Sequence, residues 1–479
     1  MSEQRPEPLR KRVLQGSVYL TIRNGVSMLL SLVGSLFITR IIGPENYGIF
    51  NAAVGIMNYL HSLVAVSITA YLVRGQSSNY IKQFHLAFWW LLGAGCVGAI
   101  VASGGVVVAS AVSRRQDDFV PIALSLFVWL PAVMLCTVPQ ALLERNLNYR
   151  ALAAVQITAQ VSTYLVAIPM AQLGFGAWAL AGGFWLGQAV QVVGYFVVAR
   201  YRPRWYWNRA DWKQMMHYSI SRTLSVWLYN LRELAPSVIL FPLAGERAMG
   251  YYALADRLMR TMGFLYTAIG GVAFAAFARI QEDKARLTKA IQETIQYKII
   301  FLGVVFSIFG ACVGLLAAWM LGPKWDSFVI QQLCIVMASR VLLASVFGVQ
   351  TQALYVIGQN WFKFRANLVY AVVLGATSLI FVNQSPVALA PLMFILADHI
   401  AHVPAYWYDI YGVHKYIGRI DYRLIVLWLL ATQAALFAPL VSYWLYAAAV
   451  GILMHPLSVR GLVGIFQSLR DTYLQRGTT

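Results

Sequence analysis

The chain has 479 residues, of which 59% are hydrophobic and only 11% charged, so it is too apolar for a soluble globular protein. At about 20 residues per membrane helix plus short loops, this length divides into about fourteen spans and leaves no room for a soluble catalytic domain. The net charge of +19 is typical of the Lys- and Arg-rich cytoplasmic loops of a membrane protein, and we expect no nucleic-acid partner.

Residues 1–15 are polar and basic and lack a small-residue cleavage site, which predicts a retained, cytoplasmic N-terminal segment. Four cysteines lie in apolar runs without CxxC spacing or a nearby histidine, so we expect buried side chains and no metal site. They are Cys96, Cys136, Cys312 and Cys334.

Long apolar stretches, separated by charges or by Gly, Pro and Asn, predict an all-α polytopic membrane protein. The predicted spans are 16–42, 48–72, 84–112, 119–142, 151–173, 176–199, 218–243, 248–278, 298–321, 328–357, 364–382, 387–411, 423–441 and 443–468. The last two could form one long span with an interfacial segment, so the prediction is about fourteen helices, with twelve or thirteen as alternatives.

Most of the 37 Lys and Arg residues fall on one side of this map, together with both termini. The other side holds Arg40, Arg114, Arg115, Arg247 and Lys324. Because Lys- and Arg-rich loops resist translocation, this asymmetry predicts that both termini are cytoplasmic and that the number of spans is even.

An internal repeat divides the chain, since GPENYGIFNAA at 43–53 recurs as GERAMGYYALA at 245–255, an offset of 202 residues. Each copy lies at the outer end of one span and opens the next. The repeat predicts two like-oriented lobes of six spans with a substrate cavity between them.

The resulting domain map has six parts. They are the N-terminal segment 1–15, an N-lobe 16–199, a linker 200–217, a C-lobe 218–411, two further helices in 423–468 and a cytoplasmic tail 469–479. The linker is basic and aromatic, and we expect it to lie on the membrane, because Trp and Tyr suit the interface and Arg suits anionic headgroups.

Six arginines fall inside predicted spans, where each would cost about 2.5–3.5 kcal/mol at a lipid-facing helix centre. They are Arg23, Arg222, Arg232, Arg257, Arg260 and Arg340. Arg232 and Arg257 could pair locally with Glu233 and Asp256. Arg23 and Arg222 lie close enough to the cytoplasmic helix ends for their side chains to snorkel to the interface. We expect Arg260 and Arg340 to lack an acidic neighbour within one helical turn. A water-filled cavity lined by several of these side chains accounts for their presence.

The opening GSVYLTIRNGVSMLLSLVGSLFITRIIGPENYGIFNAA resembles the start of polysaccharide flippases. These form the O-antigen and exopolysaccharide (Wzx-like) branch of the multidrug/oligosaccharidyl-lipid/polysaccharide (MOP) exporter superfamily. The most specific part of the resemblance is the pattern Arg40, Gly43, Pro44, Tyr47 and Gly48. The second copy of the repeat lacks the Pro and the Tyr. The resemblance implies two six-helix lobes in a V-shaped arrangement plus two C-terminal helices.

The resemblance also implies a function: polyprenyl (undecaprenyl)-pyrophosphate-linked repeat units move from the cytoplasmic to the periplasmic leaflet of the bacterial inner membrane by alternating access. The implied products are O-antigen, exopolysaccharide or capsule. The expected partners are this lipid-linked oligosaccharide, membrane lipids and the polysaccharide polymerase or export machinery, and the protein is expected to be a monomer.

Arginine grips phosphate oxygens bidentately and keeps its charge, so the intramembrane arginines are the candidates for holding the pyrophosphate. The leading four are Arg23, Arg232, Arg260 and Arg340, with Arg222 and Arg257 as further candidates. The competing interpretation for each is a structural ion pair or a snorkelled anchor.

Titratable groups within the spans are candidates for proton or ion coupling. They are Glu233, Asp256, Asp398, His61, His399 and His402. Asp398, His399 and His402 form the densest group, with a satisfied interhelical hydrogen-bond cluster as the alternative interpretation. The sequence does not distinguish H+ coupling, Na+ coupling or passive exchange, and we expect no cofactor and no resident metal.

Three rival classes remain. A multidrug exporter of organic cations would need a cavity rich in carboxylates or aromatic groups, whereas a lipid II flippase would have an equally cationic cavity. A membrane polymerase or ligase would need a sizeable outer loop with catalytic groups, and Asp117 and Asp118 form the single outer acidic pair of the predicted map. A GK[ST] phosphate loop is absent from the sequence, so we expect a transporter and not an enzyme.

Overall fold

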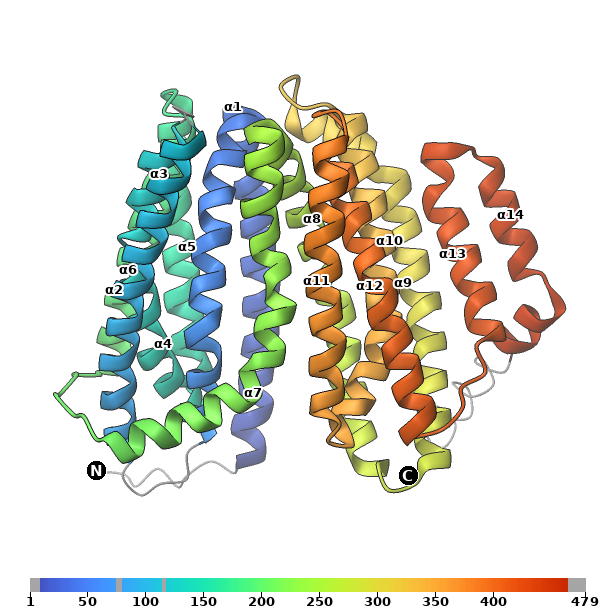
Figure 1. Cartoon of the computed structure of the whole chain (residues 1–479), viewed down its shortest axis with the longest axis horizontal. Helices are drawn as coiled ribbons and strands as arrows, with labels where there is room; N and C mark the ends of the chain where they lie inside the picture. Colours follow the sequence, from blue (N-terminus) through green and yellow to red (C-terminus); the bar gives the residue numbers. More distant parts are fainter. Residues whose placement is uncertain (1–8, 75–79, 114–117, 464–479) are drawn as a thin grey trace. The chain divides into compact units, whose positions relative to one another are not determined.

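The computed structural model describes residues 9–74, 80–113 and 118–463, and these form helices without a strand (Figure 1). The first half contains α1 (Leu9–Arg74), α2 (Tyr80–Ser113), α3 (Phe119–Phe127), α4 (Leu130–Arg145), α5 (Tyr149–Gln172), α6 (Ala177–Ala199), α7 (Arg209–Ala235), the π-helical turn η1 (Pro236–Leu240) and α8 (Phe241–Ile280). The second half contains α9 (Lys284–Leu321), α10 (Ser327–Val356), α11 (Asn360–Gln384), α12 (Ala390–Tyr416), α13 (Arg423–Val441) and α14 (Trp444–Leu453). The predicted all-α fold is confirmed.

Among the described residues, nine helices are long and apolar enough to cross a membrane, or ten if the bent pair Trp444–Leu453 and Pro456–Val463 forms one span. The nine count α1 once although it is broken, and they leave out α7, α8 and α12, which carry ionisable side chains. Each of the fourteen predicted ranges falls on helix to within a few residues, the last of them running beyond the described part. The chain is a multi-pass membrane protein, and fourteen crossings stay a prediction.

Two glycines at equivalent positions of the repeat break long helices. Gly43 interrupts α1 at φ 80° and ψ 174°, and Gly245 interrupts α8 at φ 84° and ψ −175°. A side chain would strain the backbone in this region of positive φ, which accounts for glycine at both places. The repeat found in the sequence therefore corresponds to the same local structure in both copies.

The chain divides into two compact units. Unit 1 comprises residues 1–253 and 382–391, and unit 2 comprises 254–381 and 392–479. The division falls between residues 253 and 254, inside the second copy of the repeat in α8, instead of at the linker, because α7 packs along α1. The predicted lobe boundaries at 199 and 218 stay a prediction, and each unit is described separately.

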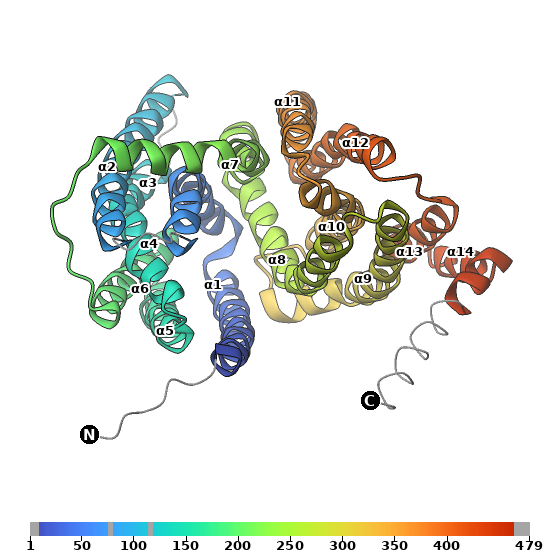
Figure 2. The ribbon, with the colours of Figure 1, turned by 90° about the horizontal axis from the view of Figure 1, so that it is seen from below.

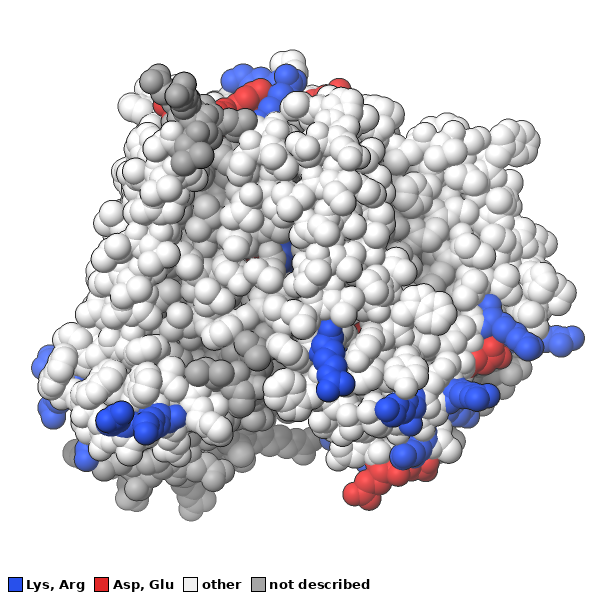
Figure 3. Space-filling view, viewed as in Figure 1, with Lys and Arg blue, Asp and Glu red and all other residues white. Residues whose placement is uncertain are grey.

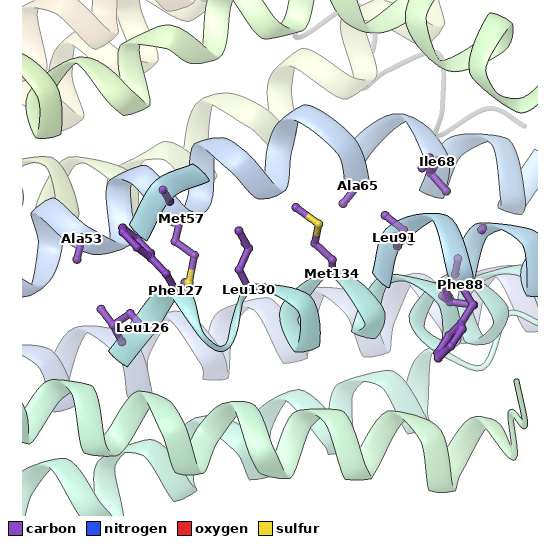
Figure 4. Packing of buried hydrophobic residues seen from close by; sticks show 14 of the residues in the cluster. Ala53, Met57, Ala65, Ile68, Phe88, Leu91, Leu126, Phe127, Leu130 and Met134 are labelled. Atoms are coloured by element: carbon purple, nitrogen blue, oxygen red, sulfur yellow. The ribbon is translucent and has the colours of Figure 1, made fainter. Parts of the chain in front are cut away.

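The core of unit 1 is built mainly from α1, α2, α3 and α4, with buried residues of α6 and α7 added to it. Figure 4 shows Met57 of α1 lying beside Phe127 and Leu130, and Met134 continues the same row. Small residues allow close approach, since a Cβ on Gly95 of α2 would lie 2.6 Å from the Pro131 Cα of α4. Association of membrane helices depends on such small-residue contacts, because lipid supplies no hydrophobic driving force between them.

Unit 2 is built around α9, which packs against α10 and α13, while α13 also contacts α14 (Figure 2). Gly303 of α9 lies against Thr432 of α13. Helix α9 begins at Lys284, fourteen residues before the predicted start at 298, because the Asp283 side chain accepts a hydrogen bond from the Arg286 N–H at 3.0 Å and caps it.

The prediction that all four cysteines are buried is confirmed for two of them. Cys136 and Cys334 are buried, whereas Cys96 and Cys312 are exposed. The prediction of burial is wrong for the second pair, because an apolar run in a membrane protein presents side chains to lipid as well as to the core.

Candidate substrate and coupling site

The two copies of the repeat contact each other within unit 1. A Cβ atom on Gly48 would overlap the Glu246 carbonyl oxygen, and one on Gly250 would overlap the Pro44 carbonyl oxygen. Residues 44 and 246, like 48 and 250, are separated by the repeat offset of 202. The contact is therefore reciprocal, as at a local two-fold axis, where equivalent patches face each other.

An ion pair between equivalent positions lies at this contact. The Arg247 Nε is 3.7 Å from the Glu45 Oε1, and residue 247 is residue 45 plus the repeat offset. Both side chains are about half exposed or more, so the ion pair adds little to stability. It does join two positions that are equivalent in the repeat.

The family motif divides into structural roles. Tyr47 is buried at 2% exposure and Arg40 is exposed. The Asn46 side chain, which the sequence did not single out, accepts a hydrogen bond from the Ala177 N–H at 3.0 Å and so holds the first turn of α6. Asn46 lies 131 residues before Ala177, so a rule for local helix caps could not have identified this contact from the sequence.

Unit 1 holds three of the predicted arginines. The Arg232 Nε lies 3.5 Å from the Glu233 Oε1, and its guanidinium is 4.4 Å from the Tyr229 ring centroid. The predicted local pairing of Arg232 with Glu233 is confirmed. Arg23 and Arg222 lie on α1 and α7, and their side chains are outside the described set, while His61 is half-buried on α1.

Unit 2 holds the other three. The Arg260 Nε is 2.5 Å from the Asp256 Oδ2, so the prediction that Arg260 has no acidic neighbour within one turn is wrong. Residues four apart face the same side of a helix, and Arg260 nevertheless remains 58% exposed. Arg257, adjacent to Asp256, is half-buried on the same helix.

Arg340 of α10 reaches across to α12. Its Nε lies 3.2 Å from the Asp398 Oδ2, and both side chains are only 12% exposed. The prediction that Arg340 has no acidic neighbour within one turn of its own helix is confirmed. The side chain is nevertheless paired, because its partner Asp398 comes from another helix.

Asp398 is the centre of a polar cluster. Tyr370 of α11 donates its hydroxyl to the Asp398 Oδ1 at 2.8 Å, and the His402 Nδ1 lies 3.2 Å from the same oxygen and 2.7 Å from the Asp398 carbonyl oxygen. The His399 Nδ1 is instead 3.0 Å from the carbonyl oxygen of Ile395 on its own helix. Of the predicted trio, the structure brings together Asp398 and His402, which are four residues apart.

A second buried charge cluster was missed from the sequence. The Lys363 Nζ of α11 lies 2.9 Å from both carboxylate oxygens of Asp409 on α12, and Thr351 of α10 donates its hydroxyl to the Asp409 Oδ2 at 2.7 Å. Lys363 is 5% and Asp409 2% exposed. Asp398 and Asp409 are eleven residues, about three turns, apart on one face of α12, and this spacing was the available signal.

Lys298, the first residue of the predicted span 298–321, is a further buried cation that the sequence did not single out. It lies within α9 at 2% exposure, where its Nζ donates to the Ser345 carbonyl oxygen at 3.3 Å. A Lys predicted at the start of a span lies within the helix when the helix begins earlier than predicted, as α9 does.

Solved structures define the class of protein that has this fold. The chain is similar to the lipid II flippase MurJ in an inward closed conformation, with a TM-score of 0.71 and 10% identity over 96% of this chain and 100% of that one. It is also similar to an inward-facing multidrug resistance MATE family transporter of the MOP superfamily, with a TM-score of 0.64 and 14% identity over 84% and 98%. The fold is that of MOP-superfamily transporters.

Residues 37–330 match the family described as polysaccharide biosynthesis protein, and the chain belongs to this family. One curated relative is the succinoglycan biosynthesis transport protein ExoT of Rhizobium meliloti, 23% identical over 278 residues, which are 57% of this chain and 55% of that protein. Another is the lipopolysaccharide biosynthesis protein WzxC of Escherichia coli, 22% identical over 345 residues, or 68% and 67%. The match thus spans about half the length of ExoT and two thirds of WzxC.

Proposed function

We propose that this protein is a flippase that moves polyprenyl (undecaprenyl)-pyrophosphate-linked polysaccharide repeat units from the cytoplasmic to the periplasmic leaflet of a bacterial inner membrane. The observation that carries the proposal is the combination of a MOP-transporter fold with a family whose relatives are named for succinoglycan transport and lipopolysaccharide biosynthesis. The protein acts as a transporter and not as an enzyme. Both termini lie in the cytoplasm, the working unit is a monomer, and a polymerase or export complex takes over the product.

The pyrophosphate is held by arginines in this proposal. Arg260 is the candidate that the structure favours, because its guanidinium is more than half exposed although Asp256 contacts its Nε. Arg340 reaches the substrate only by exchanging Asp398 for a phosphate oxygen. Arg23, Arg222, Arg232 and Arg257 complete the set of candidates. A guanidinium suits this task because its planar fork matches two phosphate oxygens at once.

We expect Arg260→Ala to slow flipping by about tenfold or more, since a hydrogen bond to a charged group contributes about 1.5–3 kcal/mol. The measurement is transfer of a labelled prenyl-pyrophosphate oligosaccharide across proteoliposome bilayers. Arg279→Ala, an exposed arginine at the end of the same helix, is the matched control and should keep the wild-type rate.

Equal flipping by the Arg260 and Arg279 variants would remove Arg260 from the site. Transport of lipid II in preference to other prenyl-pyrophosphate sugars would instead favour the lipid II flippase. Efflux of small organic cations by the wild type, without flipping, would move the protein to the multidrug branch and make the arginines structural.

We further propose that coupling to H+ or Na+ takes place at Asp398. A proton or a cation bound there would compete with Arg340 for the same carboxylate, and would thereby release Arg340 toward the substrate. Asp398→Asn is expected to abolish any dependence of flipping on the ion gradient. His399→Gln, which alters a histidine bonded to its own helix, should leave that dependence intact. Gradient-dependent flipping by Asp398→Asn would contradict the assignment.

A further inference from the structure

The segment between α6 and α7 is docked on the start of α2. Tyr201 is 6% exposed, and its hydroxyl lies 3.0 Å from the His85 Nδ1. The Trp89 indole N–H donates to the Arg204 carbonyl oxygen at 3.0 Å, and the Trp89 ring lies 4.8 Å from that of Trp205, centroid to centroid. These contacts give residues 200–208 a defined course although they form no helix.

The first turns of α7 continue this docked segment. The Asn208 side chain accepts hydrogen bonds from the Ala210 and Asp211 N–H groups at 2.8 and 3.3 Å and starts the helix. Met215 is fully buried, and Trp212 packs against Trp90 of α2 at 5.6 Å between ring centroids. Figures 1 and 2 show these turns crossing the end of α2 at a steep angle before α7 turns along α1. The apolar side therefore faces unit 1, and the opposite side remains exposed.

Basic side chains gather on the exposed side. We call them, together with Trp205 and Trp207, the linker surface: Lys82, Arg202, Arg204, Arg209 and Lys213, all exposed. Within the described residues, none of these five cations takes part in an ion pair. Figure 3 shows Lys and Arg gathered at this end of unit 1, below a middle zone almost without charge.

The one acidic residue of this segment is already engaged. Tyr206 donates its hydroxyl to the Asp211 Oδ2 at 2.5 Å, and this hydrogen bond raises the pKa of Tyr206. The Tyr206 ring also lies 5.8 Å from the Lys82 Nζ. The linker surface therefore keeps a strong positive excess, with its single carboxylate tied to a neighbouring hydroxyl.

Two large aromatic side chains project from the same surface. Trp205 is 75% and Trp207 50% exposed. Tryptophan prefers the headgroup level of a bilayer, where its ring is partly apolar and its N–H can be solvated. Exposed Trp interleaved with Arg is thus the composition expected of a surface that contacts lipid headgroups, whereas an acidic soluble partner would need the charges alone.

We propose that the linker surface binds the headgroups of anionic phospholipids in the membrane that holds the protein. The Arg and Lys side chains contact headgroup phosphates, while Trp205 and Trp207 enter the interface beside them. The docking on α2 holds these groups in place before lipid arrives, which lowers the entropic cost of binding. This binding is independent of the transported substrate.

The test uses the full chain reconstituted in phosphatidylcholine bilayers that contain spin-labelled phosphatidylglycerol or spin-labelled phosphatidylcholine. The fraction of each label immobilised by the protein gives the preference for anionic lipid. We expect the triple variant Arg202→Gln, Arg204→Gln and Arg209→Gln to lose about tenfold in that preference, because each basic residue near an anionic surface contributes a few-fold in affinity. The corresponding triple Lys variant should retain it, and added salt should weaken it in the wild type.

The matched control neutralises three other exposed arginines outside the linker, Arg279, Arg286 and Arg419. Equal loss in the linker and control variants would overturn the proposal, because the preference would then follow total charge. An unchanged preference in the linker variant, in protein that elutes and unfolds as the wild type does, would also overturn it. The proposal would likewise be overturned if the linker variant lost binding of an acidic protein but kept its preference for phosphatidylglycerol.

Discussion

Lys363→Met and Asp409→Leu are each expected to lower the free energy of unfolding of unit 2 by about 3–5 kcal/mol. Either change leaves the other charge buried without a counter-ion, and an uncompensated buried charge is far more costly than the loss of a contact. The pair is suited to this test because both residues are at most 5% exposed and the Lys363 Nζ lies 2.9 Å from both Asp409 carboxylate oxygens.

The double variant Lys363→Met with Asp409→Leu should recover most of the stability, because two apolar side chains of similar volume often replace a buried ion pair without net cost. The measurement is the thermal unfolding midpoint of the purified protein in detergent, and the coupling follows from the double-mutant cycle. Lys415→Met serves as control, since Lys415 is exposed at the end of α12 and should shift the midpoint little. Additive losses in the double variant would contradict the interpretation of a mutually neutralising pair.

The helices and the repeat were predictable because they depend on local properties. Apolar length marks a membrane helix wherever its neighbours lie, and a glycine with positive φ is required at both Gly43 and Gly245 by the local turn alone. The same holds for the Asp256 and Arg260 pair, whose four-residue spacing was visible in the sequence and was overlooked.

The interhelical pairs were not predictable in this way. Arg340 meets Asp398, and Lys363 meets Asp409, only because α10, α11 and α12 are neighbours, and one sequence does not say which helices are adjacent. The predicted span 364–382 left Lys363 in the loop before it, since a buried cation with a distant partner has the same sequence signature as a loop cation. Intramembrane charges therefore identify the region of interest, while their partners come from the fold.

The second large effect is expected at the contact between the two copies of the repeat. Gly250→Val should force the segments around Gly250 and Pro44 apart, because the new side chain would overlap the Pro44 carbonyl oxygen, which belongs to backbone and cannot rotate away. The resemblance to polysaccharide flippases implies alternating access, in which one repeat moves against the other, and we expect this contact to form and to open in each cycle. We expect flipping to fall by about tenfold or more, and a cysteine at the buried position Ala248 to become more reactive toward a membrane-impermeant maleimide.

The reciprocity of the contact sharpens this prediction. Gly48→Val should act in the same direction, since a Cβ there would overlap the Glu246 carbonyl oxygen. The double variant should be little worse than either single one, because a contact held open by one valine has room for the other, and such shared-contact effects are not additive. Gly375→Val is the matched control, as a Cβ on Gly375 of α11 meets no atom within 4 Å. Normal flipping and unchanged labelling in the Gly48 and Gly250 variants would show that the close approach of the two copies is not needed for transport. Effects that simply added would show that the two glycines act at separate places instead of at one shared contact.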